Sequence, residues 1–272
     1  MKLGVIIKLT GAIEAKFDDL IRLGLSTCQL DCWEPQYFTP QMAERIKAAA
    51  QARGVEITAL WCGWEGPKIW DLVEGPLTLG IVPVTYRYAR MKNLMQGADF
   101  AVQLGVKDMV THVGFIPEDP NDLNYSGVVS ALRVLAVYCQ ARGLNFLFET
   151  GEETPVTLLR VIEDLGMDNV GLNLDPANLI LYGKGNPVDA LDVFGSYVRG
   201  VHAKDGLYPT SGRALGKEVA LGQGKVDFPR LVAKLKALGY QGALTIEREI
   251  SGPQQEKDIL MAKAMLEALI AA

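Results

Sequence analysis

Residues 145–175 read NFLFETGEETPVTLLRVIEDLGMDNVGLNLD, and this stretch decides the fold. Two short apolar runs, at 144–149 and 169–175, flank a segment at 155–165 that has the apolar spacing of a helix. Both runs are continuously apolar rather than alternating, which is typical of parallel strands covered on both faces. Each run ends on a carboxylate. The stretch therefore predicts a strand–helix–strand unit with an acidic residue at the end of each strand.

The same alternation extends over the whole chain. Strand-like runs occur at 3–7, 26–30, 55–61, 107–112, 144–149, 169–175, 197–203 and 242–247. Helix-like segments occur at 16–23, 39–53, 82–104, 122–142, 155–165, 187–195, 227–238 and 255–270. The chain has 272 residues, and a barrel of eight such units uses about 250 as one domain. We therefore predict an α/β protein with a single (β/α)8 TIM barrel over residues 1–272; a doubly wound open sheet is the alternative.

Composition and charge narrow the class of protein. Apolar residues make up 49% of the chain and charged residues 22%, and the net charge is −5. An acidic chain without a basic run is a poor binder of a phosphate backbone, so no nucleic-acid partner is expected. No apolar run reaches the roughly 18 residues that a membrane span needs, and no signal peptide opens the chain. Four cysteines without a CxxC pair indicate reduced thiols, and we expect a cytoplasmic protein.

Two connections are longer than the scaffold requires. The segments 63–81 and 205–225 both follow strand-like runs, so both are expected at the end of the barrel where such enzymes place their substrate loops. We predict that they act as lids. The apolar helix-like segments at 82–104 and 255–270 fit either packing on the barrel or the interface of a homo-oligomer, a dimer or tetramer.

Four residues stand where strand-like runs end: Glu149, Asp175, His202 and Glu247, at spacings of 26, 27 and 45 residues. Parallel strands bring their carboxyl ends together, so the four side chains are expected to converge. Any one carboxylate could merely cap a helix or pair with a lysine, but four at consecutive strand ends favour a metal site. Three carboxylates and one imidazole favour one Mn²⁺ or Mg²⁺ ion, with Co²⁺ or Zn²⁺ as alternatives.

The two glutamates suggest the reaction. Strands five and eight of an eight-strand ring place Glu149 and Glu247 on either side of the mouth. A metal that polarises a sugar carbonyl acidifies the neighbouring C–H, and one glutamate can remove that proton while the other returns it. The outcome is isomerisation or epimerisation through a metal-stabilised enediolate.

Other functions remain open for the same barrel. The first alternative is a lyase, a dehydratase or a keto-sugar deglycosidase that starts from the same proton removal. An endonuclease IV-like phosphodiesterase is disfavoured, because its zinc cluster is rich in histidine and this chain has two histidines. A sugar-binding barrel without activity is a further alternative, although none of the four expected ligands is missing.

Several motifs resemble the xylose isomerase-like TIM-barrel superfamily, in particular its sugar (phosphate) isomerase/epimerase branch with the tagatose 3-epimerase-like enzymes. They are THVG (111–114), FETGEET (148–154), NLDPANL (173–179), GVHAKD (200–205), LGQGKVDF (221–228) and TIERE (245–249). The resemblance covers nearly the whole chain. It implies that Glu149, Asp175, His202 and Glu247 bind one metal and that the two glutamates handle protons.

The chain departs from this family at three places. Asn178 stands where many of the epimerases carry a histidine that touches substrate oxygens. Tyr208 and Pro209 stand near the position of a common arginine, and Gln223 replaces a common acidic residue. We expect Asn178 to hydrogen-bond the substrate. These differences leave the metal ligands intact but put the substrates of the best-studied members in doubt.

Further side chains are candidates for substrate binding, each with a plainer interpretation. His112 is expected at the barrel mouth as a substrate contact or a support for the ligands. Trp33 and Trp61 could form an aromatic platform for a sugar ring or simply pack. Glu153 could belong to the proton-transfer network or complement a helix start, and Asp205 could orient His202, contact substrate or form a surface pair.

A last motif bears on the substrate. The Gly222-x-Gly224 pair fits a phosphate-binding turn, although a plain tight turn explains it better. We expect a small-molecule sugar or sugar derivative, with its phosphorylation left open.

Overall fold

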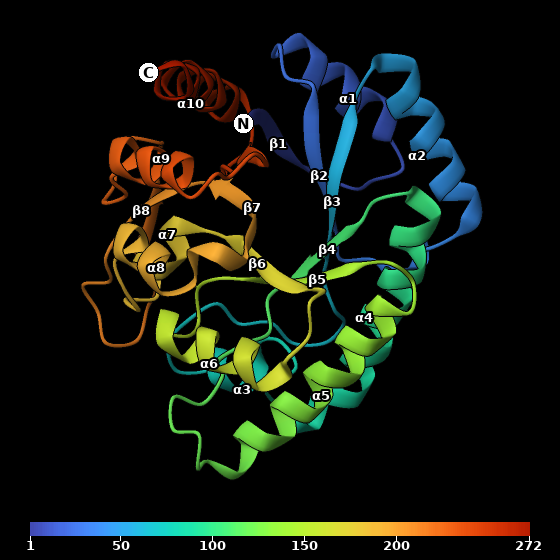
Figure 1. Cartoon of the computed structure of the whole chain (residues 1–272). Coiled ribbons are helices and arrows are strands. Elements are labelled where there is room, and N and C mark those ends of the chain that lie inside the picture. Colours follow the sequence, from blue (N-terminus) through green and yellow to red (C-terminus); the bar gives the residue numbers. More distant parts are fainter.

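The eight apolar runs pair side by side and close into a barrel. The computed structural model describes residues 1–272, and its parallel strands follow the closed order β1-β10-β7-β6-β5-β4-β3-β2. The barrel strands are β1 (Lys2–Lys8), β2 (Thr27–Cys32), β3 (Glu56–Cys62), β4 (Asp108–Thr111), β5 (Asn145–Glu149), β6 (Val170–Leu174), β7 (Val198–Ala203) and β10 (Ala243–Ile246). The predicted (β/α)8 barrel is confirmed, and the open-sheet alternative is wrong. Figure 1 shows the two termini close together where β10 closes on β1.

Helices surround the strands (Figure 1). The longer ones are α1 (Ile13–Arg22), α2 (Pro40–Arg53), α4 (Val84–Leu104), α5 (Leu123–Gln140), α6 (Pro155–Leu165), α8 (Pro187–Phe194), α9 (Phe228–Ala237) and α10 (Pro253–Ala271). Their ends follow local chemistry. The hydroxyl of Thr154 accepts a hydrogen bond from the N–H of Thr157 at the start of α6, and Gly166 ends that helix with a left-handed φ of 57°. None of the helices is long and apolar enough to cross a bilayer.

The structure adds short elements that the sequence pattern did not predict. These are α3 (Gly75–Thr78), α7 (Pro176–Leu181), the 3₁₀ turns η1 (Pro35–Tyr37) and η2 (Gly195–Tyr197), and a hairpin of β8 (Asp205–Leu207) with β9 (Lys217–Val219). Each spans six residues or fewer, which is too short for a helical or alternating pattern to stand out. Most of them lie in the connections that follow barrel strands, so they shape the mouth rather than the scaffold.

The two long connections meet each other. The N–H of Leu72, in the segment 63–81, donates to the carbonyl of Arg213, in the segment 205–225, at 2.9 Å. Both segments also contribute side chains to the cavity at the mouth, through Trp70 and Leu215. They therefore lie where lids would lie, and their opening and closing stays a prediction.

Arg90 on α4 holds the first of these connections. Its side chain is buried, with 1% of the residue exposed, and the rings of Trp64 and Tyr86 flank its guanidinium. The guanidinium donates to four backbone carbonyls at 2.6 to 3.2 Å, those of Glu65, Pro67, Thr78 and Gly80. Because buried carbonyls need donors, this one side chain satisfies both ends of the connection.

We predict that Arg90→Met lowers the free energy of unfolding by about 3 kcal/mol, because it leaves the buried carbonyls of Thr78 and Gly80 without this donor. Urea-induced unfolding followed by circular dichroism measures the change. Lys92→Met is the matched control on the exposed side of the same helix, and its effect is expected to stay within about 0.5 kcal/mol. Equal stability of the two variants would contradict this role of Arg90.

Candidate metal centre and active site

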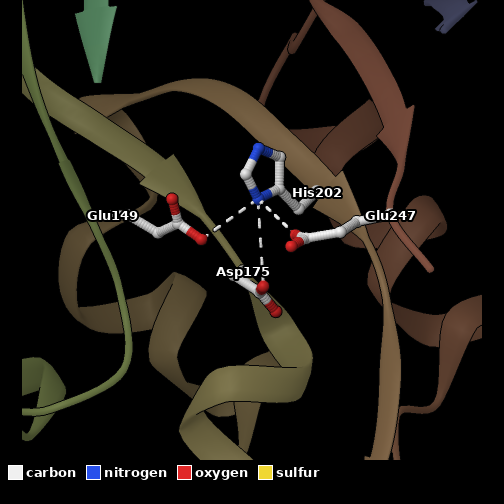
Figure 2. A group of neighbouring side chains, drawn as sticks. All are labelled: Glu149, Asp175, His202 and Glu247. Carbon is white, nitrogen blue, oxygen red and sulfur yellow. Dashed lines mark hydrogen bonds and ion pairs between the residues drawn. The ribbon is translucent and has the colours of Figure 1, made fainter. Parts of the chain in front are cut away.

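Four predicted residues meet at the carboxyl end of the barrel. Glu149 is the last residue of β5, Asp175 follows β6, His202 lies near the end of β7, and Glu247 follows β10. One ligand atom from each lies within 4.8 Å of the others. Figure 2 shows the three carboxylates gathered around one ring nitrogen of the imidazole. That nitrogen, Nδ1, is 2.9 Å from Oε2 of Glu247, 3.1 Å from Oε1 of Glu149 and 3.8 Å from Oδ2 of Asp175.

The other ring nitrogen of His202 fixes which nitrogen faces the carboxylates. Nε2 lies 2.9 Å from Oε1 of Gln29, an amide oxygen that can only accept, so Nε2 carries the proton. Gln29 is oriented in turn because its Nε2 donates to Oδ1 of Asn173 at 2.9 Å. Gly200 leaves room for this contact, since a Cβ there would lie 2.3 Å from Oδ1 of Asn173. Nδ1 is thereby the nitrogen that faces the three carboxylates. Burial acts to lower the pKa of His202, but the charges of Glu149 and then Glu247 outweigh burial and raise it, so without a metal Nδ1 also carries a proton, which a bound metal would displace.

Asp175 divides its two oxygens between structure and site. Oδ1 accepts the N–H of Asn178 at 3.0 Å and caps α7, which begins at Pro176. Oδ2 is buried and has no hydrogen-bond partner, and the same holds for Oε2 of Glu247. Buried oxygens without partners are costly. These two oxygens therefore indicate that a cation binds between them.

The donor set fits a divalent cation. Bonds of roughly 2.1 Å place neighbouring ligand atoms roughly 3 Å apart and opposite ones roughly 4.2 Å apart, and the separations here stay below 4.8 Å. Three carboxylate oxygens and one imidazole nitrogen are donors that Mn²⁺ and Mg²⁺ accept. The residues present therefore fit the metal that the sequence predicts.

A buried lysine balances part of the negative charge. Lys204 is 3% exposed, and its ammonium lies 2.6 Å from Oε1 of Glu249, 3.3 Å from Oε1 of Glu247 and 3.5 Å from Oδ2 of Asp175. Burial acts to lower the pKa of Lys204, but the carboxylates, Glu247 first, outweigh it and raise this pKa. The ammonium therefore keeps its charge. It offsets part of the negative charge of Glu249, Glu247 and Asp175, and a divalent cation would offset more.

The two glutamates differ in what holds their second oxygen. Oε2 of Glu149 accepts from the indole N–H of Trp61, whereas Oε1 of Glu247 accepts from the ammonium of Lys204. Burial acts to raise the pKa of both carboxyls, but neighbouring cations outweigh it: His202 and then His112 for Glu149, and Lys204 and then His202 for Glu247. Both carboxyls therefore have lowered pKa values, with a neutral donor beside one and a charged donor beside the other.

His112 completes the inner wall. It follows β4 directly, its Nδ1 lies 3.0 Å from Oε2 of Glu152, and its Nε2 lies 3.6 Å from Oε1 of Glu149. Burial acts to lower the pKa of His112, but the charges of Glu152 and Glu149 outweigh burial and raise it to about 9. At neutral pH both ring nitrogens are therefore donors.

A cavity of about 830 Å³ opens above the cluster and extends between α1 and α10. Aromatic rings form one wall: the centroid of Trp33 lies 4.9 Å from that of Trp61 and 6.3 Å from that of Trp70. Trp70 also stands edge-on to His112, with centroids 5.4 Å apart. The cavity thus has a charged side over the cluster and an aromatic side over β2 and β3.

The structure brings most of the other predicted site residues to this cavity. Trp33, Trp61, His112 and Asn178 all line it. Asn178 spans two charged groups, because its Nδ2 donates to Oε1 of Glu149 and its Oδ1 accepts from Lys204, both at 3.4 Å.

Two predicted residues lie elsewhere. Asp205 does not face the cavity: its carboxylate accepts the backbone N–H groups of Gly206, Gly222, Gly224 and Val226. Glu153 is buried but does not line the cavity, and its neighbour Glu152 takes the contact with His112. The expectation of a substrate contact is therefore corrected for both residues.

Sequence reasoning missed four residues of the site, namely Gln29, Lys204, Glu152 and Trp70. A strand alternates its side chains, so Lys204 faces the same way as His202 while Asp205 faces the opposite way. Strand alternation therefore favours Lys204 over Asp205 as the residue that faces the cavity. A glutamine inside an apolar strand, as in STCQLDC, could have marked Gln29. Nothing in the sequence indicates how the loops orient Glu152 or Trp70.

Known proteins share this architecture. A xylose isomerase domain protein from Planctomyces limnophilus is 34% identical, and its crystal structure matches with a TM-score of 0.92 over 98% of this chain and 96% of that one. A 3-keto-D-glucoside 4-epimerase from E. coli shares the fold at 20% identity and a TM-score of 0.74, over 98% and 99% of the two chains. A D-tagatose 3-epimerase-like protein shares the fold at 21% identity and a TM-score of 0.75, over 100% of this chain and 97% of that one.

Sequence comparison agrees with these structures. The chain is 29% identical over 175 residues to an uncharacterized protein from Methanocaldococcus jannaschii. The matched segment spans 59% of this chain and 57% of that relative's length. The family model described as xylose isomerase-like TIM barrel matches residues 17–269. The resemblance seen in the motifs is thereby confirmed. The chain belongs to the xylose isomerase-like TIM barrel family.

Proposed function

We propose that this protein is a divalent-metal-dependent isomerase or epimerase of a sugar or sugar derivative. One observation carries the proposal: Glu149 and Glu247 each give one oxygen to the cluster and hold the other outside it, from strands β5 and β10 that are three apart in the ring. Of two carboxylates that flank one substrate atom, one can remove a proton as a base, and the other can return one after it has itself taken a proton from solvent. The fold shared with the E. coli 4-epimerase supports the same reading.

The metal would be held by Glu149, Asp175, His202 and Glu247. When bound, a divalent cation polarises a substrate carbonyl and so acidifies the adjacent C–H. We favour Mn²⁺ or Mg²⁺, because three of the four donors are carboxylate oxygens.

The chain's own residues supply the proton transfers. Glu149 takes or gives a proton at Oε2, where the indole N–H of Trp61 keeps the carboxylate in place. Glu247 does the same on the other side of the cavity at Oε1, beside the ammonium of Lys204. His112 donates a hydrogen bond from Nε2 to a substrate oxygen, with Glu152 fixing the ring from behind.

The aromatic wall restricts water. Trp33, Trp61 and Trp70 present apolar ring surface to the substrate. A sugar ring or chain packs its C–H face on such a surface while its hydroxyls stay free for polar partners. Exclusion of water strengthens the charge interactions at the cluster and protects the deprotonated substrate.

We predict that the metal-loaded protein exchanges deuterium from D₂O into the carbon next to the carbonyl of a ketose it accepts. Glu149→Gln and Glu247→Gln should each lower this exchange by about 10³-fold, since each removes a proton-transfer group. Proton NMR and mass spectrometry give the readout, and Glu163→Gln, an exposed glutamate of α6, is the control that keeps full rate. Full exchange in either site variant would contradict the mechanism, and product that has lost water would indicate a lyase instead.

A second prediction concerns the hydrogen bond behind His202. Gln29→Leu removes the acceptor that holds the proton on Nε2, so metal affinity should fall by about 10- to 100-fold. Calorimetric titration of the metal-free protein with Mn²⁺ measures the affinity. Gln51→Leu, on the exposed side of α2, is expected to bind as the wild type does. Unchanged affinity in Gln29→Leu would show that the tautomer of His202 is set by something else.

A further inference from the structure

Phosphate sites in barrels of this kind are usually built by the loops after the last two strands, with backbone N–H groups as donors. In this protein the loop after β7 carries Gly222 and Gly224. Their N–H groups both donate to Oδ2 of Asp205 at 2.9 Å, and the N–H of Val226 donates to Oδ1 at 3.0 Å. The chain's own carboxylate therefore occupies the donors that a phosphate would need.

Cationic side chains could bind a phosphate instead, but those closest to the cluster are already paired. Lys204 contacts Glu249, Glu247 and Asp175. The guanidinium of Arg248 lies 2.7 Å from both Glu218 and Asp258.

The lysines at the rim of the cavity are also poorly placed to bind a phosphate. The ammonium of Lys8 lies 3.8 Å from Glu34, and that of Lys68 lies 4.8 Å from the centroid of the Trp33 ring. Lys16 lines the cavity only from the exposed side of α1. Lys68 is therefore the one cation near the aromatic wall that faces no carboxylate.

A carboxyl without a partner lies across the cavity from Asp175. Asp31 is the penultimate residue of β2, which is four strands from β6 in either direction round the ring, and so it faces Asp175 across the mouth. Its Oδ1 is buried without a hydrogen-bond partner, and the residue lines the cavity. Trp61 is its register partner on β3, and Trp33 follows two residues later. Burial, and then the charge of Glu247, raise the pKa of Asp31 to about 7.

A carboxyl beside aromatic rings matches the chemistry of sugar hydroxyls. Its oxygens take hydroxyl hydrogen bonds, and the rings take the C–H face of the same molecule. An unpaired carboxyl is also a poor neighbour for a phosphate dianion. The end of the substrate remote from the carbonyl would lie here, because a metal held by the four ligands would keep the carbonyl end on the side of Asp175.

We infer that the site takes an unphosphorylated sugar, whose remote hydroxyls bind Asp31 against the tryptophan wall. This inference rests on the proposed function for the position of the carbonyl end. It assigns to Asp31 the selection between a free hydroxyl and a phosphate at that remote end.

Calorimetry on the manganese-loaded protein tests this with D-fructose, D-tagatose and D-psicose and with the 6-phosphate of each. At least one free ketohexose should bind about tenfold or more tightly than its 6-phosphate, and inorganic phosphate should not compete. Asp31→Ala should lower the affinity for that ketohexose by about 10- to 100-fold. The same variant should change the binding of D-erythrulose, a four-carbon ketose without the remote hydroxyls, by less than about threefold.

Lys68→Ala is the matched control, because it removes a rim side chain on the same wall and should leave the preference unchanged. Tighter binding of a 6-phosphate, particularly if Lys68→Ala abolishes it, would overturn the inference, as would ketohexose binding that Asp31→Ala leaves intact. Selective binding without deuterium exchange would instead refute the proposed function and leave the assignment of Asp31 standing.

Discussion

Three buried carboxylates around one imidazole nitrogen are the constraint on which the rest of this structure depends. Glu149, Asp175 and Glu247 are 12% exposed or less in their side chains, and bringing them together without a cation would cost several kcal/mol. The ammonium of Lys204 offsets one charge. The remainder calls for a divalent cation, which the unpartnered oxygens of Asp175 and Glu247 are placed to bind.

The barrel fixes the side chains of this cluster because it brings together strands that are far apart in the sequence. Below the carboxylates, Gln29 of β2 reaches both His202 of β7 and Asn173 of β6, so a layer of polar side chains crosses the interior. Every hydrogen bond in this layer limits the orientation of the imidazole. Because the ring cannot turn, the same nitrogen always faces the carboxylates. The orientation of His202 therefore depends on side chains from three strands of the barrel interior.

The two glutamates that we propose for proton transfer have different hydrogen-bond partners although their positions look similar. Glu149 is held by the indole of Trp61 on the aromatic side of the cavity, and Glu247 by Lys204 on the charged side. A neutral donor stabilises a carboxylate less than an ammonium does. The site therefore has a direction, with the tryptophan wall and Asp31 on one side and the paired charges on the other.

The sequence predicts the barrel and the cluster because both follow from repetition. Eight apolar runs fix the strands, and residues at their carboxyl ends must converge whatever the loops do. For Asp205 and Glu153 the sequence leaves a site role and a plainer role open, and local structure places both side chains outside the cavity lining. Strand alternation turns Asp205 away into the 222–226 loop, and the backbone after β5 presents Glu152 rather than Glu153 to His112. Loop conformation of that kind has no periodic signal in the sequence.

A crystal structure of the protein soaked in Mn²⁺, with anomalous scattering measured at the manganese edge, would show directly whether these four residues bind one metal ion. We expect one anomalous peak, bound by Nδ1 of His202 and by one oxygen each of Glu149, Asp175 and Glu247. Nε2 of His202 should keep its hydrogen bond to Gln29. A metal bound through Nε2, or no peak among these four residues at saturating Mn²⁺, would contradict this expectation.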